Sequence, residues 1–151
     1  MHIVRKAVVV ACAVVLAAIL VSCGEDGDSA QSKDAWQEEH ADLIAAYEKD
    51  LDAAGDTINR GEKQATISAC TQLSDDAKEI KDEALPVPNP AVDGPLRQSV
   101  DIALTAADNC IQGGRTTEEH GARRVEAAMK ELTDAHRKFL EAKAAIEAWE
   151  D

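Results

Sequence analysis

The side chains that could carry chemistry outside the N-terminal region are a few histidines, two cysteines and many carboxylates. His40, His120 and His136 are the histidines beyond the first apolar run. Helical di-iron sites place a glutamate three positions before each histidine, and none of these three has one there. His136 or Met129 could serve as an axial haem ligand, but nothing in the sequence requires a cofactor. We therefore predict no metal and no cofactor.

Signatures of catalysis are also missing from the sequence. It has no Gly-x-Ser-x-Gly nucleophile motif and no glycine-rich phosphate loop. The acidic stretch Glu25–Asp28 does not match a calcium-binding loop. Paired carboxylates such as Asp75-Asp76 are typical of solvated helix faces. We therefore predict a protein that is not an enzyme and has no catalytic residues.

The four cysteines fall into three classes. Cys12 lies inside an N-terminal apolar run, Cys23 follows that run, and Cys70 and Cys110 lie forty residues apart in the remaining chain. This spacing is not a Cys-x-x-Cys redox motif. A pair of cysteines in an exported protein predicts one structural disulfide, Cys70–Cys110. Two separate buried thiols are the alternative.

The N-terminus has the layout of a secretory signal peptide. Arg5 and Lys6 precede fifteen consecutive apolar residues, Ala7–Val21, and small residues follow. Fifteen residues are fewer than the ~20 that a helix needs to cross a bilayer. A short transmembrane anchor remains the alternative to cleavage.

The end of this run, Leu20-Val21-Ser22-Cys23, resembles the lipobox of bacterial lipoproteins. The resemblance implies cleavage before Cys23 and attachment of a diacylglyceryl group, with acyl chains such as palmitate, to its sulfur. It also implies an anchor on the extracytoplasmic face of the cell membrane. An ordinary cleavage site with a coincidental cysteine is the other interpretation.

Three regions follow from this interpretation. Residues 1–22 form the signal peptide, residues 23–32 form the lipidated cysteine and a polar tether, and residues 33–151 form one helical domain. The formal net charge of the chain is −13, and loss of residues 1–22 removes two basic residues and no acidic one. Such an acidic domain is a poor ligand for nucleic acid or for anionic lipid. Membrane contact is therefore expected through Cys23.

Apolar periodicity predicts four helices in the domain. The first begins near Ser32, a candidate N-cap, and ends either at Gly55 or near Arg60. The second spans roughly Glu62–Ala84. No segment has the alternating pattern of a β-strand, and aromatic residues are only 3% of the chain.

Proline and glycine set the expected limits of the third helix. Leu85–Gly94 contains three prolines and is predicted to be a loop. Asp93 is the expected N-cap, Pro95 is expected in the first turn, and Gly113-Gly114 is expected to end the helix near Gln112.

The fourth helix is predicted to start at a capping box, Thr116-x-x-Glu119, and to run to Trp149. Its apolar stripe alternates spacings of four and three residues, as in a coiled coil. The members of that stripe are Val125, Met129, Leu132, His136, Phe139, Lys143 and Ile146, with Ala128, Ala135, Ala142 and Trp149 beside them.

These helices predict an all-α fold, an antiparallel up-down-up-down four-helix bundle with one helix–helix disulfide. Cys70 lies fourteen residues before the expected end of the second helix at Ala84, and Cys110 lies fourteen residues after the expected start of the third helix near Leu96. The two cysteines are therefore expected at the same height of an antiparallel hairpin. Trp36 and Trp149 are expected to meet beside the tether and cap the core. An aromatic contact site for lipid or a partner is the alternative role for this pair.

The domain resembles the small alanine-rich, two-cysteine helical lipoproteins of high-GC Gram-positive bacteria. The sequence thus favours a binding or interaction module of the cell envelope, with an envelope protein as its partner. A helix face or the proline loop would make the contact. The alternative function is a carrier that holds a lipid or another hydrophobic ligand within the helices.

Overall fold

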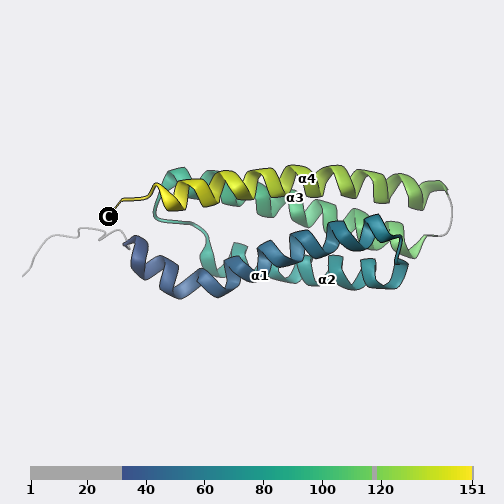
Figure 1. Cartoon of the computed structure of the whole chain (residues 1–151), viewed down its shortest axis with the longest axis horizontal. Coiled ribbons are helices and arrows are strands. Elements are labelled where there is room, and N and C mark those ends of the chain that lie inside the picture. Colours follow the sequence, from purple (N-terminus) through teal and green to yellow (C-terminus); the bar gives the residue numbers. More distant parts are fainter. Residues whose placement is uncertain (1–31, 117–118, 151) are drawn as a thin grey trace, which may run out of the picture.

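The computed structural model describes residues 32–116 and 119–150, which are helical and contain no β-strand. The elements are α1 (Lys33–Arg60), α2 (Lys63–Glu79), the π-helix η1 (Ile80–Ala84), α3 (Pro90–Arg115) and α4 (Glu119–Glu147). Figure 1 shows the long helices lying alongside one another. The predicted signal peptide, Cys23 and tether residues 24–31 lie outside the described residues.

Helix α1 has clear signals at both ends. The Ser32 hydroxyl accepts a hydrogen bond from the Ala35 N–H, as expected for an N-cap. The helix continues through Gly55 and ends at Arg60, where Gly61 adopts a left-handed conformation with φ of 69°. Of the two predicted ends for this helix, the one near Arg60 is confirmed.

The second helix reaches Ala84 as predicted, but its last turn is wider than an α-helix. The Leu85 N–H donates to the Ile80 carbonyl, five residues earlier. The Ala84 carbonyl accepts from the indole Nε1 of Trp36 at 3.4 Å. The π turn therefore ends α2 while fixing the ring of Trp36 on α1.

The predicted start of the third helix is wrong. Asn89, not Asp93, is the N-cap, and Pro90 occupies the first turn. The Asp93 carboxylate instead accepts the Val87 N–H at 2.9 Å and closes the preceding loop. Pro95 lies inside the helix. Asn89 followed by Pro90 is also typical of a helix start, and it lies four residues before Asp93. The helix therefore includes residues 90–94 of the predicted loop.

The predicted end of this helix is also wrong, since Gly113 and Gly114 lie inside α3 and are buried. A Cβ built at Gly113 would lie 2.8 Å from Cγ2 of Val125, and one at Gly114 would lie 2.6 Å from Cγ1 of Ile67. These glycines therefore permit close approach of α4 and α2 to α3. Helix-terminating sequence patterns and close-contact patterns both use glycine, so the sequence alone does not separate them.

Thr116 is the C-cap of α3, and its hydroxyl donates to the Gln112 carbonyl. The middle of the predicted capping box, residues 117–118, lies outside the described residues. Helix α4 begins at Glu119 and ends at Glu147, two residues before the predicted end at Trp149.

The core lies between all the helices, and the disulfide crosses it. Cys70 on α2 and Cys110 on α3 are bonded and fully buried, with Cα atoms 6.3 Å apart. The predicted Cys70–Cys110 disulfide is therefore confirmed. Helices α3 and α4 pack along their length, α2 packs on α3 and on α1, and α1 and α4 make the sparsest contact of these pairs.

A buried polar chain links three helices at the centre of the core. The Tyr47 hydroxyl on α1 is 2.9 Å from the Ser99 hydroxyl on α3, which donates to the Ala135 carbonyl on α4 at 2.8 Å. Burial raises the pKa of Tyr47 far above its ordinary value, although the Ser99 hydrogen bond opposes the rise. The phenol therefore stays neutral and serves only as a hydrogen-bonding group.

Candidate functional site

The sparse contact between α1 and α4 leaves an open groove along their seam. Towards the α1–α2 turn it encloses about 410 Å³ between Leu51, Gly55 and Asn59 on α1 and Met129, Leu132 and Leu140 on α4. Towards the chain termini, a second hollow of about 260 Å³ lies between the same two helices. We refer to these two hollows together as the α1–α4 groove.

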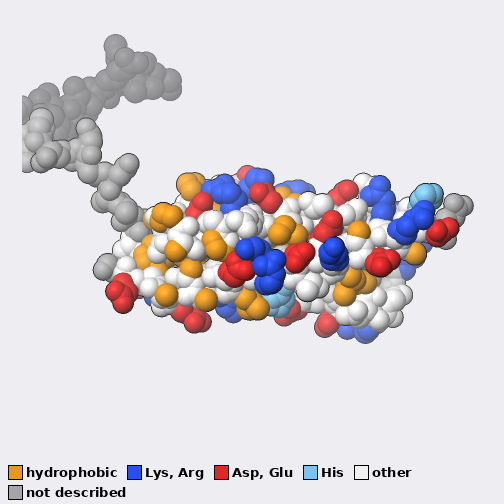
Figure 2. Space-filling model, turned by 90° about the horizontal axis from the view of Figure 1, so that it is seen from above, with side chains coloured by type: hydrophobic (Ala, Val, Ile, Leu, Met, Phe, Trp, Pro, Cys, Tyr) orange, Lys and Arg blue, Asp and Glu red, His pale blue; other side chains and the backbone are white. Residues whose placement is uncertain are grey.

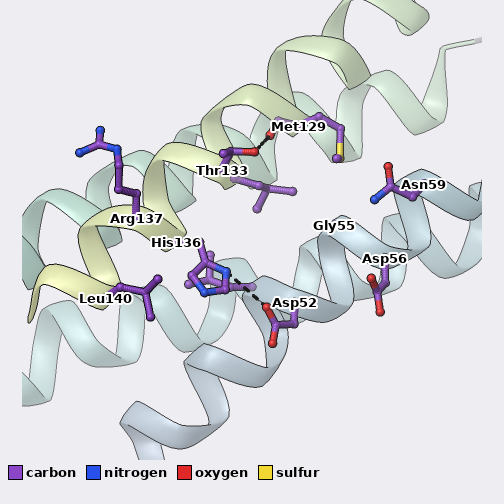
Figure 3. Close-up of a pocket in the computed structure, with 11 residues that line it drawn as sticks. Asp52, Gly55, Asp56, Asn59, Met129, Thr133, His136, Arg137 and Leu140 are labelled. Atoms are coloured by element: carbon purple, nitrogen blue, oxygen red, sulfur yellow. Dashed lines mark hydrogen bonds and ion pairs between the residues drawn. The ribbon is translucent and has the colours of Figure 1, made fainter. Parts of the chain in front are cut away.

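Long polar side chains bridge the groove at two points. His136 Nδ1 lies 3.3 Å from an Asp52 carboxylate oxygen, and Lys143 Nζ lies 2.7 Å from a Glu48 carboxylate oxygen. Figure 3 shows His136 and Asp52 pointing towards each other across the space between the helices. The Lys143 ammonium also lies 5.8 Å from the centre of the Phe139 ring. These contacts hold the walls of the groove without filling it.

The orientation of α4 explains why polar side chains reach the seam. Ala128, Ala135 and Ala142 are fully buried, although the sequence placed them beside the main apolar stripe. Met129 and His136, with Lys143, form a row with a spacing of seven residues, and all three are only partly buried. The helix therefore turns its alanine row towards the core and its longer side chains towards α1.

The groove also has an exposed apolar side chain on one wall and a glycine on the other. Leu140 is 49% exposed and is the one large hydrophobic side chain that is exposed among the described residues. Gly55 leaves the opposite wall without a side chain, and nothing lies within 4 Å of a Cβ built there. Figure 3 shows Leu140 on α4 and Gly55 on α1 at the edges of the same space.

Charges around the groove belong mostly to local ion pairs. The Arg137 guanidinium pairs with Asp134 and Glu141 on its own helix and points away from the gap (Figure 3). The Lys138 hydrogen bond lowers the pKa of Glu141 below its ordinary value. On α1, the Asp52 and Asp56 carboxylates are exposed on the groove wall. Figure 2 shows acidic and basic groups alternating with small hydrophobic patches on one face of the molecule.

A different carboxylate pair lies between α1 and α2. Burial, followed by a hydrogen bond to Asp76, raises the pKa of Asp50 above its ordinary value. Asp76 is buried and accepts a hydrogen bond from the Gln72 amide at 2.8 Å.

A third hollow, of about 390 Å³, lies where α3 turns into α4. Gly113, Gly114 and Gly121 line it, together with residues such as Lys63 and Thr66 on α2. Close packing between helices already accounts for these glycines, because a Cβ on any of them would meet a neighbouring atom within 3 Å.

The two tryptophans meet at the end of the molecule that holds both ends of the described chain. The Trp36 ring centre lies 6.0 Å from that of Trp149 and 5.3 Å from that of His40. Trp36 and His40 are buried, and Trp149 is partly buried. The predicted meeting of the two tryptophans is present, and their rings pack against the core.

No protein-family model, curated protein or solved structure matches this chain. The function has to be argued from its own residues.

In the groove, His136 and Asp52 form an imidazole–carboxylate pair, but the neighbouring Thr133 hydroxyl donates to the Met129 carbonyl and is not directed at His136. The described residues contain no group of three or more His, Cys, Asp or Glu placed to hold a metal ion. Within the same residues, no helix is both long and apolar enough to cross a membrane.

The histidines singled out from the sequence do not come together as one site. His40 is buried beside Trp36, His136 lies at the groove, and His120 is exposed near the start of α4 with Arg123 3.0 Å from its Nδ1. Sequence reasoning missed the groove itself. The usable signal was a row of Met129, His136 and Lys143, which places two polar residues inside an apolar stripe.

Proposed function

We propose that this protein is a lipid-anchored, non-enzymatic binding module on the extracytoplasmic face of the cell membrane. Cys23 carries the anchor, and the α1–α4 groove binds an envelope protein. The observation that supports this proposal best is the exposed Leu140 beside a groove that the chain's own side chains leave open. A hollow lined mainly by apolar side chains with a few polar groups is typical of binding sites.

The proposed arrangement of the helices is an antiparallel up-down-up-down four-helix bundle. Each helix contacts the next in sequence, and α1 also contacts α4, which is the pattern of a closed ring. The Lys33 ammonium at the start of α1 donates to the Trp149 carbonyl just beyond α4, so these two helix ends are adjacent. In this topology the groove runs along the module and the tether leaves from one end.

Site-specific photo-crosslinking in intact cells tests the binding role. A photoreactive residue replaces Leu140 in one version of the full chain, and Ser68, an exposed residue of α2, in a matched control. We expect a discrete crosslinked protein from position 140 and none of that mass from position 68. The same species from both positions, or none from position 140, would contradict the proposal.

The anchor is tested separately by mass spectrometry of the membrane-extracted chain. The Cys23→Ala variant is expected to lose the diacylglyceryl mass and to accumulate as an uncleaved or mislocalised precursor. A variant that remains cleaved, lipidated and membrane-bound would show that the Leu20–Cys23 pattern is not a lipobox.

The second candidate is a carrier of a lipid or another hydrophobic ligand. The hollow of about 410 Å³ supports it, because many small-molecule sites enclose ~300–1,000 Å³. Native mass spectrometry of the gently extracted chain decides between the candidates. An acyl-chain mass in addition to that on Cys23 would favour the carrier, and a bare lipidated chain would favour the binding module.

A further inference from the structure

The glycines of the described residues can be sorted by the reason for which each lacks a side chain. Gly61 has a positive φ of 69°, which favours glycine. Gly94 precedes Pro95 inside α3, and a proline ring disfavours the helical conformation of a preceding residue that has a Cβ. The three glycines where α3 meets α4 lie where a Cβ would come within 3 Å of another atom. The chain's own geometry therefore explains all of these.

Gly55 has no such explanation. It lies well inside α1, its φ is not positive, and a Cβ built on it would meet nothing within 4 Å. A glycine inside a helix is less favourable than alanine, so it normally has a reason. Gly55 lines the α1–α4 groove, and glycine is the residue that lets another molecule approach the backbone closely.

We propose that the α1–α4 groove is the docking site of one basic amphipathic helix from a partner protein, whose closest approach is to Gly55. This inference rests on the proposed binding function and adds the class of partner. The groove and Gly55 supply the shape, and Leu140 supplies an exposed apolar contact.

Backbone chemistry favours a helix over an extended peptide as the occupant. The walls of the groove are α1 and α4, whose backbone N–H and carbonyl groups are already bonded within each helix. An extended segment would find no strand edge to pair with, and its own backbone groups would be left unpaired when buried. A helix satisfies its backbone internally and presents one apolar face to the groove.

Charge favours a basic partner. Asp56 is exposed on the α1 wall, and so is Asp52, which faces His136 across the groove. Arg137 also lines the groove, but its charge is paired with two acids of its own helix. The whole chain carries a net charge of −13. A second copy of the chain would bring the same negative charge to the contact. Anionic lipid would be repelled in the same way. Lys and Arg beside the apolar stripe of the incoming helix would complement the acidic wall.

The length of the groove sets the size of the helix. On α4 the main hollow extends from Met129 to Leu140. Twelve residues of helix span roughly 17 Å, so about three turns of a partner helix would lie along it.

The test measures binding of two synthetic 18-residue helical peptides to the full chain, held in zwitterionic phosphatidylcholine nanodiscs with empty nanodiscs as the blank. Both peptides have a leucine stripe; one has lysine on its polar face and the other has glutamate. Gly55→Leu fills the groove, and Ser68→Leu adds the same side chain on the exposed face of α2. Leucine suits a helix better than glycine, so Gly55→Leu is expected to keep or raise the unfolding midpoint.

We expect the lysine peptide to bind the unsubstituted chain and the Ser68→Leu variant with similar affinity. Its affinity for Gly55→Leu should fall by about tenfold or more, which is the loss of one good contact. The glutamate peptide should bind at least about tenfold more weakly than the lysine peptide.

Several results would overturn the inference. Failure of the lysine peptide to bind, or equal binding to Gly55→Leu and the unsubstituted chain, would exclude a helix at this groove. Laurate binding, or dimerisation in sedimentation experiments, that Gly55→Leu abolishes would assign the groove to a lipid or to a second copy. A discrete crosslink from position 140 alongside any of these results would leave the binding function intact and exclude only the basic helix.

Discussion

Two seams of the molecule are built in opposite ways. Where α3 meets α4 and α2, glycines bring the backbones together, and the Cys70–Cys110 bond ties α2 to α3. Where α1 meets α4, the Glu48–Lys143 and His136–Asp52 pairs reach across a space that remains open.

Small and long side chains thus produce two kinds of contact between helices. Glycine lets two helices approach each other at short distance, which favours dense packing along their line of contact. Partly exposed ion pairs span a wider gap and contribute little to stability. We therefore expect the first seam to contribute more to the stability of the fold than the second, which we propose as the binding surface.

Of the substitutions that test this difference between the seams, loss of the disulfide is expected to change stability most. Removing the bond with a Cys70→Ser, Cys110→Ser double substitution should lower the free energy of unfolding by about 2–5 kcal/mol, because the unfolded chain gains freedom. Urea unfolding measures the change, and adding a reductant to the unsubstituted chain in denaturant should reproduce it. Equal stability with and without the bond would show that the α2–α3 contact is held by packing alone.

The same Gly→Ala substitution is expected to have opposite signs at the two seams. At Gly121 the new Cβ would lie 2.7 Å from the Thr116 carbonyl oxygen, a backbone atom, so overpacking should cost about 1–3 kcal/mol. At Gly55 it would meet open space, so better helix propensity should add about 0.5–1 kcal/mol. Thermal unfolding of both variants gives the signs, and two shifts in the same direction would refute the contrast.

The Lys143–Glu48 ion pair across the α1–α4 groove is expected to contribute far less to stability. Lys143→Met keeps the apolar stem of the side chain and removes the charge opposite Glu48, so we expect a loss of only about 0.2–1 kcal/mol. A double-mutant cycle with Glu48→Gln isolates the coupling between the two groups. A coupling above about 2 kcal/mol would mean that this seam is as firmly held as the other.

The smallest effect concerns the acid pair between α1 and α2. The pKa of Asp50 is raised in the folded chain, so its protonated form stabilises the fold below its ordinary value of 3.8, and this stabilisation is lost as the pH rises through the folded value. Asp50→Asn should remove that loss, and so raise the stability by less than about 1 kcal/mol at pH values above the folded pKa of Asp50. Urea midpoints between about pH 3 and pH 7 should show a flatter profile than those of the parent chain.

Local signals predicted most of the helices because those signals act within a few residues. Ser32 caps α1 as expected, and periodicity gave the extent of α2 and α4 to within a few residues. The start of α3 was wrong because Asn89-Pro90 and Asp93-x-Pro95 present similar local signals. The end of α3 was wrong because its two terminal glycines serve contacts with residues distant in sequence.

The sequence analysis named several residues of the candidate site but did not predict that they line a common groove. Met129 and His136 were assigned to an apolar stripe, and Gly55 was considered as a helix end. They meet at the α1–α4 groove because of how α4 is rotated about its own axis. The wide apolar stripe of this helix is compatible with more than one rotation, so the sequence did not predict it. Tertiary packing chose the rotation that buries Ala128, Ala135 and Ala142.

The helical class of this protein could be predicted from the sequence, because periodicity and capping act within a few residues of the chain. The Cys70–Cys110 pairing could be predicted because these are the two cysteines that follow Cys23. Only the packing of the helices shows which glycines lie at helix–helix contacts, which polar residues of α4 face α1, and where a groove stays open. Those properties depend on the distance between helix axes, and that distance is set by side chains that meet only in the folded molecule.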